Sequence, residues 1–352
     1  MLVSSSFGSR PILLAMLFLL VSCGQRRAST SETLIIGGQP TQAPAYFAAL
    51  HQIGDQEPFC GGSLIAPHVV ITAAHCVSPF RGDLAVWMGM TSVDSKPTPI
   101  QAQAIIRHPR YHNRKFQHDL ALVFLESSLT TKTITLAGSD ATQDRLRIYG
   151  YGNTSRDGFV YPTNIQTAEV QEIGTGQCKT LGGSYGTIIE EQICAGDMQK
   201  GATDSCDGDS GGPLVVGAQT QELYGLVSWG TGCGQAGRPG VYTRLAPYHD
   251  WIQETVDHMM QGDTPLDEFL AALFYGPLRY QDASGAERQF TASYQLWRKA
   301  ASSVATAALA TWEKTWQNGT VRLELHSRGP QRYEWRAFVR GEWYTAATHF
   351  SQ

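Results

Sequence analysis

The chain has 352 residues, and its 27 Lys and Arg residues nearly balance its 31 Asp and Glu residues, leaving a net charge of −4. This balance excludes the strongly basic surface that nucleic-acid binding requires. The length exceeds that of an average single domain, so we expect more than one folded unit. Six of the seven cysteines lie between positions 60 and 233, and an even set of cysteines in a secreted chain favours disulfide bonds.

The first 22 residues predict a secretory signal peptide. They contain one basic residue, Arg10, followed by the apolar run from 12 to 21, which is too short for a membrane span. Leu20-Val21-Ser22-Cys23 also resembles a bacterial lipobox, in which Cys23 becomes the lipid-modified first residue of the mature protein. Lipidation would anchor the precursor to the outer side of a bacterial envelope; the alternative is an ordinary signal peptide that ends near Cys23.

Two segments place a histidine and an aspartate at the ends of apolar strands. Thr72-Ala73-Ala74-His75-Cys76 follows the apolar stretch 69–71, which predicts a buried strand. Asp119 opens a second strand-like run that extends to Leu125. An imidazole and a carboxylate at strand ends are candidates for a proton-transfer pair.

The segment from Asp204 to Pro213 reads Asp-Ser-Cys-Asp-Gly-Asp-Ser-Gly-Gly-Pro and contains the candidate nucleophile, Ser210. A serine hydroxyl becomes nucleophilic only when a positioned base accepts its proton, and His75 with Asp119 would supply that base and its orienting carboxylate. The chain order His, Asp, Ser is typical of chymotrypsin-type enzymes and differs from that of subtilisins and α/β-hydrolases.

Residues 35 to about 260 resemble the trypsin-like serine endopeptidases. The matching segments, in order, are Ile35-Ile36-Gly37-Gly38, Cys60-Gly61-Gly62-Ser63-Leu64-Ile65, the His75 and Asp119 segments, the Ser210 segment, Ser228-Trp229-Gly230 and Gly240-Val241-Tyr242-Thr243. The resemblance implies an all-β fold with two six-stranded antiparallel Greek-key β-barrels and a C-terminal helix, in a catalytic domain over residues 35–260. It also implies peptide-bond hydrolysis through an acyl-enzyme.

The resemblance assigns a role to each residue of the candidate site. His75 would be the general base, Asp119 would fix its tautomer, and the backbone N–H groups of Gly208 and Ser210 would form the oxyanion hole. Asp204 would form the floor of the primary pocket and select Lys or Arg. The remaining substrate-binding residues implied are Ser205, Ser228, Trp229, Gly230 and Gly240.

The resemblance further implies a zymogen. Cleavage before Ile35 would free an ammonium group that pairs with Asp209, making residues 23–34 a propeptide. Because the residue before the cut is Leu34, an enzyme specific for Lys or Arg would not efficiently activate itself there. We expect either a separate activating protease that prefers Leu, or a first cut after Arg26 or Arg27 followed by trimming. The disulfide pairs implied are Cys60 with Cys76, Cys178 with Cys194, and Cys206 with Cys233.

No cofactor or metal is expected. Between Gly89 and Gln101, where the family has a calcium loop, Asp94 is the sole acidic residue, which leaves too few hard oxygen ligands for calcium. The expected partners are therefore protein or peptide substrates with Lys or Arg at the cleaved bond, and an activating protease. Nucleic acid is not expected.

Residues 261–352 predict a small α+β domain of unknown role. Leu266 to Leu273 has the apolar spacing of a short helix, and Asn318-Gly319 is a strong hairpin signal. Three alternating segments predict strands of a meander, with Arg340-Gly341 at the last turn: Thr320 to Leu325, Tyr333 to Val339 and Trp343 to Thr345. The rival hypothesis to an enzyme is a catalytically silent binding protein that acts through this domain. Because the chain retains His75, Asp119 and Ser210, we favour the enzyme.

Overall fold

The computed structural model describes most of the predicted catalytic region and part of the C-terminal region. The described residues are 1, 35–77, 84–138, 145–156, 158–217, 221–261, 270, 277–281, 287–291, 298–299, 308–316, 319–328, 332–339 and 341–349. The predicted signal peptide, Cys23 and the propeptide therefore lie outside the described residues, and so does the predicted helix at 266–273 except for Leu270.

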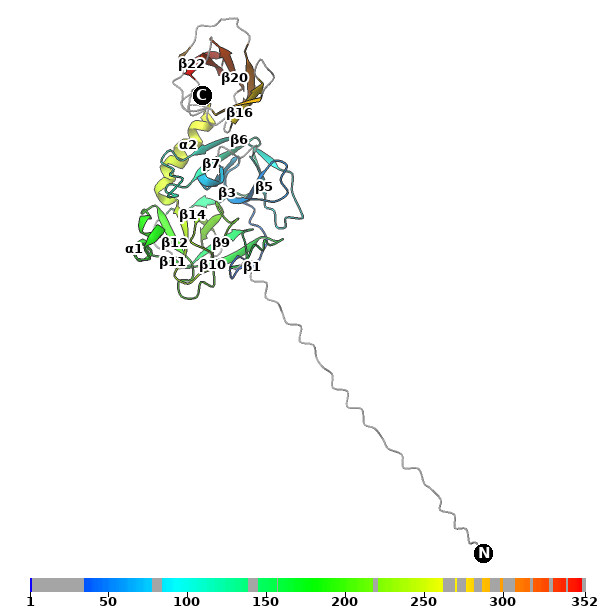
Figure 1. The fold of residues 1–352 in the computed structure, drawn as a ribbon, viewed down its shortest axis with the longest axis vertical. Helices are drawn as coiled ribbons and strands as arrows, with labels where there is room; N and C mark the ends of the chain where they lie inside the picture. The colour runs from blue at the N-terminus through cyan, green and yellow to red at the C-terminus, as the bar shows by residue number, and fades with distance from the viewer. Residues whose placement is uncertain are drawn as a thin grey trace. The chain divides into compact units, whose positions relative to one another are not determined.

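Six antiparallel strands close into a barrel in the first half of the chain (Figure 1). They are β2 (Phe47–Gln52), β3 (Cys60–Ala66), β4 (Val69–Thr72), β5 (Leu84–Met88), β6 (Ile100–Arg107) and β7 (Ala121–Leu125). Strands β4 and β7 are buried along their whole length, which is why their sequences are apolar without alternation, except for Thr72 at the end of β4. Their neighbouring ends carry His75 and Asp119, because Thr72 of β4 pairs with Ala121 of β7.

A nine-stranded sheet forms the second half. Its strands are β1 (Gln39–Pro40), β8 (Thr135–Leu136), β9 (Leu146–Gly150), β10 (Gln166–Val170), β11 (Glu172–Ile173), β12 (Gln192–Ala195), β13 (Pro213–Val216), β14 (Glu222–Trp229) and β15 (Gly240–Arg244). The predicted all-β class is confirmed. The second half is a curled sheet enlarged by the two-residue strands β1, β8 and β11, rather than a second simple ring of six strands.

Short helices connect these strands, and one longer helix follows them. The short ones are η1 (Ala74–Val77), α1 (Thr175–Lys179), η2 (Gly183–Thr187) and η3 (Ala246–Tyr248). The longer helix, α2 (His249–Gln261), is the predicted C-terminal helix. Of the helices in the described part of the chain, none is long and apolar enough to cross a bilayer.

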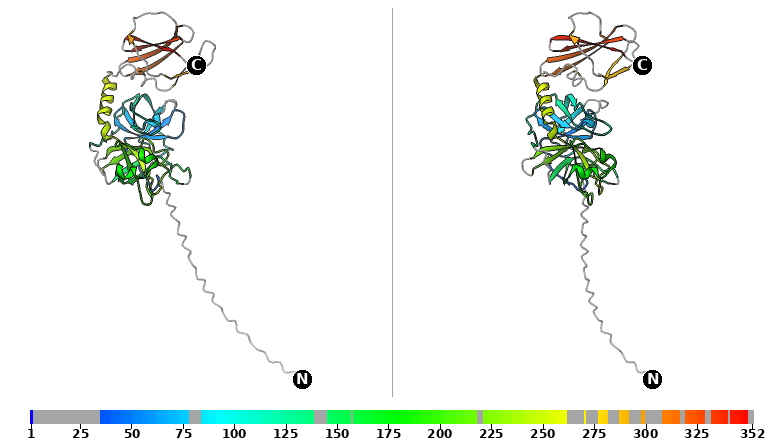
Figure 2. Two further views of the ribbon diagram at one scale, coloured as in Figure 1. Left: turned by 60° about the vertical axis from the view of Figure 1, so that its left-hand side comes forward. Right: turned by 90° about the vertical axis from the view of Figure 1, so that its left-hand side faces the viewer.

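The C-terminal region contains a five-stranded antiparallel sheet and a separate two-stranded one (Figure 2). The strands are β16 (Pro277–Gln281), β17 (Glu287–Thr291), β18 (Arg298–Lys299), β19 (Ala310–Trp316), β20 (Gly319–Ser327), β21 (Arg332–Val339) and β22 (Glu342–His349). The two predicted hairpins are present, since Trp316 pairs with Gly319 and Val339 pairs with Glu342. Trp335 is buried and lies 5.5 Å from the ring of Trp312, so aromatic packing contributes to this core.

Candidate active site

His75 and Asp119 are joined by two hydrogen bonds. The Nδ1 atom of His75 lies 2.7 Å from Oδ2 of Asp119, and the backbone N–H of His75 donates to Oδ1 at 3.0 Å. Asp119 is fully buried, whereas the side chain of His75 keeps 21% of its surface exposed. The pair is therefore held on its buried side, while the imidazole is partly exposed on the other side. The rings of His75 and Phe116 pack in a T-shaped arrangement with their centroids 5.5 Å apart.

Two side chains of the second sheet complete the shell around Asp119. Ser228, in β14, donates its hydroxyl to Oδ2 of Asp119 at 2.6 Å. Thr243, in β15, donates to the backbone carbonyl of Asp119 at 3.0 Å. With both carboxylate oxygens accepting hydrogen bonds, the buried negative charge is compensated without a cation.

Ser210 lies in the loop before β13, half-buried, and the backbone of this loop is tied to both halves. The N–H of Gly61 donates to the carbonyl of Ser210 at 2.8 Å, and the N–H of Gly211 donates to the carbonyl of Val227 at 2.8 Å. A Cβ at Gly211 would overlap the side chain of Thr72, so the loop lies directly against the end of β4 that leads to His75.

The side chains of Ser210 and His75 do not share a hydrogen bond in the described structure, where His75 Nε2 lies 3.8 Å from Sγ of Cys76. Catalytic hydrogen bonds of this kind are often long in the free enzyme and tighten in the substrate complex. The structure therefore brings His75 and Asp119 into direct contact and places the Ser210 backbone beside the strand that holds His75.

The loop before Ser210 is shaped to present backbone N–H groups. Gly208 has a φ of 100°, a conformation that favours glycine. Asp209 donates its N–H to the carbonyl of Cys206 at 2.9 Å, whereas the N–H groups of Gly208 and Ser210 donate to no acceptor among the described residues. Two unpaired donors in one turn are available to bind an anionic group.

Asp204, the predicted floor of the primary pocket, is buried and only 2% exposed. Its Oδ2 accepts the N–H of Gly234 at 2.9 Å, while its buried Oδ1 makes no hydrogen bond of regular length and angle among the described residues. The backbone N–H groups of Ser205 and Gly240 still interact favourably with the ionised carboxylate. A Cβ at Gly240 would lie 2.8 Å from that Oδ1 and 3.1 Å from the hydroxyl of Ser205. Burial raises the pKa of Asp204 to about 7.

Other predicted pocket residues lie close to Asp204. A Cβ at Gly230 would lie 3.9 Å from Cα of Gly240, so the backbones at these two glycines approach each other closely. Ser205 contacts the hydroxyl of the buried Tyr242 at 3.1 Å. Trp229 is half-buried, and its ring packs on Tyr185 at 5.4 Å. A side chain at Gly240 would collide with the Asp204 carboxylate.

Asp209 is buried in a cradle made by two glycines. Its carboxylate accepts the N–H of Gly152 at 2.8 Å and that of Cys206 at 2.9 Å, and a Cβ at Gly150 or Gly152 would overlap it. Burial raises the pKa of Asp209 to about 7. Ile35 is also fully buried, but no contact between Ile35 and Asp209 is among those described.

Three disulfide bonds brace these loops. They join Cys60 to Cys76, Cys178 to Cys194 and Cys206 to Cys233. The first connects β3 to the turn that carries His75, and the third connects the loop before Ser210 to the pocket wall near Gly234. These are the pairs that the family resemblance implied.

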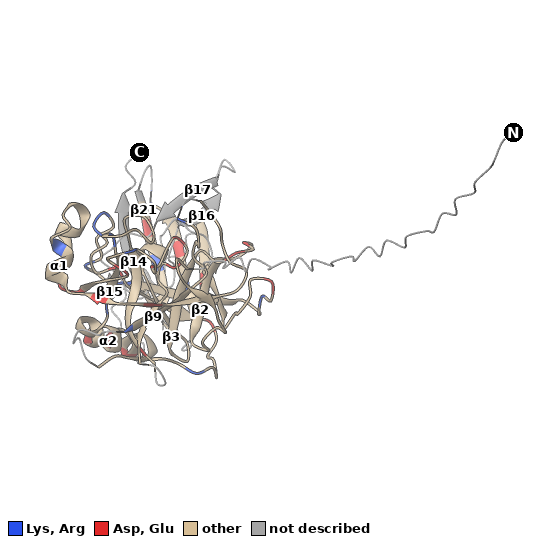
Figure 3. Ribbon diagram, turned by 90° about the horizontal axis from the view of Figure 1, so that it is seen from below, with Lys and Arg blue, Asp and Glu red and all other residues tan. Residues whose placement is uncertain are grey.

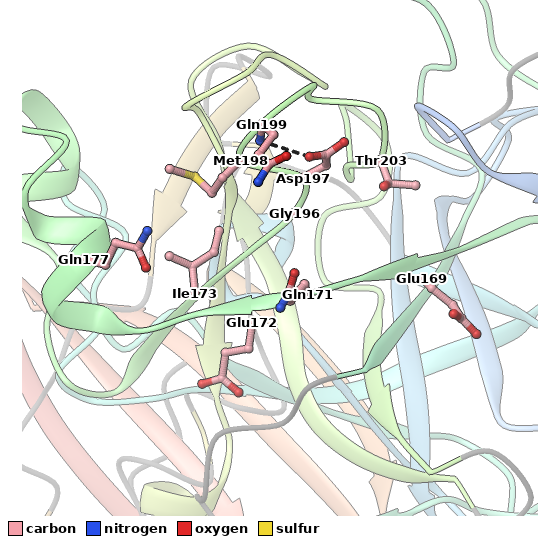
Figure 4. A pocket seen from close by; sticks show the side chains of 10 residues that line it. All are labelled: Glu169, Gln171, Glu172, Ile173, Gln177, Gly196, Asp197, Met198, Gln199 and Thr203. Atoms are coloured by element: carbon pink, nitrogen blue, oxygen red, sulfur yellow. Dashed lines mark hydrogen bonds between the residues drawn. The ribbon is translucent and has the colours of Figure 1, made fainter.

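A polar cavity of about 490 Å³ is lined by none of the predicted site residues (Figure 4). Glu172, Asp197 and Thr203 line it, and Asp197 is occupied by accepting the N–H groups of its own turn, including that of Gln199 at 3.0 Å. Acidic and basic residues are interspersed over the described ribbon (Figure 3).

Some functional contacts were not assigned from the sequence. Thr243 belongs to a segment that matched the family, but its hydrogen bond to Asp119 depends on the pairing of β14 with β15. Gly150 ends β9 and Gly152 follows it, and no motif marks these two glycines as an Asp209 cradle. Phe116 gave no signal, because its contact with His75 depends on the loop conformation.

Comparison with known proteins agrees with this geometry. The family model described as Trypsin matches residues 35–252. Cationic trypsin-3 of Rattus norvegicus is 40% identical over 209 residues, which cover 56% of this chain and 80% of that protein. Trypsin II-P29 of Gallus gallus is 36% identical over 255 residues, which cover 68% of this chain and 98% of that protein. Trypsin 5G1 of Aedes aegypti is 35% identical over 236 residues, which cover 64% of this chain and 86% of that protein.

Proposed function

Because the chain belongs to the trypsin family and is a serine endopeptidase, we propose that it cleaves peptide bonds after Lys or Arg, with Ser210, His75 and Asp119 as its catalytic triad. The specificity rests on one observation, the buried carboxylate of Asp204, whose Oδ1 atom makes no regular hydrogen bond among the described residues and which forms no ion pair with a described cation. A buried acceptor without a donor is costly, and the ammonium or guanidinium of a substrate would supply that donor.

The chemistry follows from the contacts around His75. His75 accepts the Ser210 proton at Nε2 as Oγ attacks the carbonyl carbon, and then gives the proton to the leaving amine. Asp119 keeps the Nδ1 proton in place through its 2.7 Å hydrogen bond. The N–H groups of Gly208 and Ser210 stabilise the oxyanion, and water then attacks the acyl-enzyme by the same proton route.

The substrate backbone would extend the second sheet. Ser228 and Trp229 end β14 and Gly230 follows it, at a point where the register with β15 shifts between Val227 and Trp229. A peptide that pairs with them as an added strand would pass between Asp204 and Ser210. This arrangement would bring the bond after the Lys or Arg residue to the nucleophile.

We also propose that the chain is made as a zymogen that is activated by cleavage before Ile35. Ile35 is buried, and the carbonyl of Ile36 accepts the N–H of Asp204 at 3.1 Å, so this segment contacts the pocket loop. Ile35 has a φ of 36°, an unfavourable conformation for a β-branched residue. Cleavage removes that restraint and creates an ammonium group, and Asp209 forms no ion pair with any described cation.

The mature enzyme is expected to leave its own precursor uncut at the Leu34–Ile35 bond, because an Asp204 pocket favours a cationic side chain over leucine. Precursor with Ser210→Ala, which cannot process itself, is incubated with mature enzyme and followed by intact mass. The Leu34→Arg version of the same precursor is the matched control, and we expect it to be converted. Clean conversion of the Leu34 precursor would contradict the proposal.

We propose an extracytoplasmic location, with a lipid anchor on Cys23 of the precursor. Three disulfides support an oxidising compartment. Residues 24–34 contain no cysteine that could hold the propeptide to the protease, so activation would also release the enzyme from the anchor. Mass spectrometry of the N-terminus tests both points: an unmodified Cys23 in the precursor rules out the anchor, and a mature N-terminus other than Ile35 rules out the activation site.

A serine-directed phosphonylating probe tests the enzyme itself. We expect the mature protein to be labelled and to hydrolyse Lys and Arg chromogenic peptides, and we expect both properties to be lost in Ser210→Ala, because Ser210 Oγ is the atom that the probe attacks. Labelling that persists in Ser210→Ala would assign the reactive serine elsewhere. A mature protein that neither labels nor hydrolyses would support the catalytically silent alternative.

A further inference from the structure

The short segment that presents Asp119 has an unusual backbone. Phe116 has a φ of 49° and His118 a φ of 52°, both in the left-handed region that residues with a Cβ seldom adopt. Immediately after them, the N–H of Leu120 donates to the carbonyl of His118 at 3.0 Å, which makes a tight turn centred on Asp119. A turn of this kind persists only where its surroundings hold it.

Neighbouring elements hold the segment residue by residue. The carbonyl of Phe116 accepts the side-chain amide of Gln192 at 2.9 Å, and the side-chain amide of Gln117 donates to a backbone carbonyl in η2 at 2.9 Å. His118 uses its ring: Nδ1 lies 2.8 Å from the hydroxyl of Tyr248. Of these three hydrogen bonds, this one involves the residue directly before Asp119, and it joins two side chains.

The anchor on Tyr248 is itself rigid. Tyr248 ends η3 at the start of α2 and is 1% exposed. The ring of His108 packs against His118 at 5.5 Å, against Tyr248 at 5.0 Å and against Trp251 of α2 at 4.7 Å. The backbone N–H of His108 also donates to the carbonyl of Leu120 at 3.0 Å, so the aromatic cluster contacts the turn from both sides.

The groups in this cluster are uncharged at neutral pH. Burial, with help from Arg110, lowers the pKa of His118, and Glu191 opposes this effect weakly. Burial, His118 and Arg110 lower the pKa of His108 to about 4. Burial also raises the pKa of the Tyr248 hydroxyl, so the bond to His118 joins two neutral groups across the whole working range of a neutral-pH protease.

We propose that His118 and Tyr248 are a positioning pair for Asp119, in which their hydrogen bond holds the left-handed turn that directs the Asp119 carboxylate at His75. This inference rests on the proposed function, since it concerns the orientation of the proposed triad. The pair touches no reacting atom and acts through Asp119. Because Asp204 lies on another loop and Gly240 begins β15, loss of the pair should lower kcat and leave KM nearly unchanged.

Four variants of the mature enzyme test the pair. Tyr248→Phe removes one hydroxyl, and His118→Leu removes the ring nitrogens while keeping an apolar side chain. His118→Asn tolerates a left-handed backbone and places a polar atom where His118 carries Nδ1. Tyr46→Phe is the matched control, because it removes a partly buried tyrosine hydroxyl that donates to Gln221 at 2.6 Å and has no contact with the Asp119 segment.

We expect kcat per titrated active site to fall about 10-fold to 100-fold in His118→Leu, the loss that small misplacement of a catalytic group causes, and to fall in the same direction in Tyr248→Phe. His118→Asn should restore most of kcat, and Tyr46→Phe should match the parent. Parental kcat in both His118→Leu and Tyr248→Phe would overturn the inference while the proposed function stands. A loss in His118→Leu that Asn does not restore, or that raises KM as much as it lowers kcat, would also overturn it. A parent enzyme without activity would instead refute the proposed function.

Discussion

Asp119→Asn is expected to lower kcat by about 10⁴-fold with little change in KM, which is the loss that a wrong histidine tautomer causes in a triad of this kind. In the structure, Oδ2 of Asp119 receives hydrogen bonds from both His75 Nδ1 and the hydroxyl of Ser228, at 2.7 Å and 2.6 Å. An amide nitrogen at that position can only donate. It would face the Nδ1 lone pair and leave the proton on Nε2, where His75 could no longer accept the proton of Ser210.

The measurement is steady-state hydrolysis of a Lys chromogenic peptide, with active sites counted by burst titration in the parent. Asp197→Asn is the matched control, because Asp197 is a turn carboxylate that bonds only backbone N–H groups among the described contacts. We expect the control to retain parental kcat. Retention of more than a few per cent of kcat in Asp119→Asn would show that Asp119 does not orient the base.

Asp204→Ser is expected to reduce kcat/KM for Lys and Arg substrates by about 100-fold to 5000-fold, because removing one partner of a buried ion pair costs about 3–5 kcal/mol. The parent carboxylate is 2% exposed and one of its oxygens makes no regular hydrogen bond among the described residues, so a substrate cation would find its counter-charge there. In the variant the same substrate cation would be buried without a negative charge beside it. Substrates with an apolar residue before the cut should not lose rate.

The pH dependence gives a second measure of the same pocket. Burial raises the pKa of Asp204 to about 7 in the free enzyme. A bound cation favours the ionised carboxylate, so affinity for Lys and Arg substrates is present above that pKa and is lost as the pH falls through it. The quantity to follow is the ratio of kcat/KM for a Lys substrate to kcat/KM for an apolar substrate. Ionisation of the triad changes both values by the same factor, so it does not affect their ratio. An equally pH-dependent ratio in Asp204→Ser would exclude this role.

The local motifs could be predicted from the sequence because each one is complete within a few residues. The strands that end near His75 and begin near Asp119 are apolar without alternation, except for Thr72, and the structure has them as β4 and β7. In the C-terminal region the alternating segments are present as β20, β21 and β22, and β19 pairs with β20 across the predicted turn. Periodicity is a sufficient signal where one face of a strand is buried.

The parts that could not be predicted depend on contacts between distant positions. The two-residue strands β8 and β11 are too short for any periodic signal and exist because longer strands offer them free edges. The left-handed conformation of His118 is not encoded by a glycine, and its partner Tyr248 lies 130 positions away. Strands β16 and β17 mix charged and apolar residues without strict alternation, so the sequence did not distinguish them from loops.

The two halves of the protease meet through the candidate active site. None of the three disulfides in the described chain joins the first barrel to the second sheet, because each pair lies within one half. The contacts that do cross include the Gly61–Ser210 backbone bond and the bonds that Ser228 and Thr243 make to Asp119. Assembly of the site and association of the halves are therefore thermodynamically linked. A ligand bound at this junction acts as a non-covalent cross-link between two folding units and raises the free energy of unfolding by mass action.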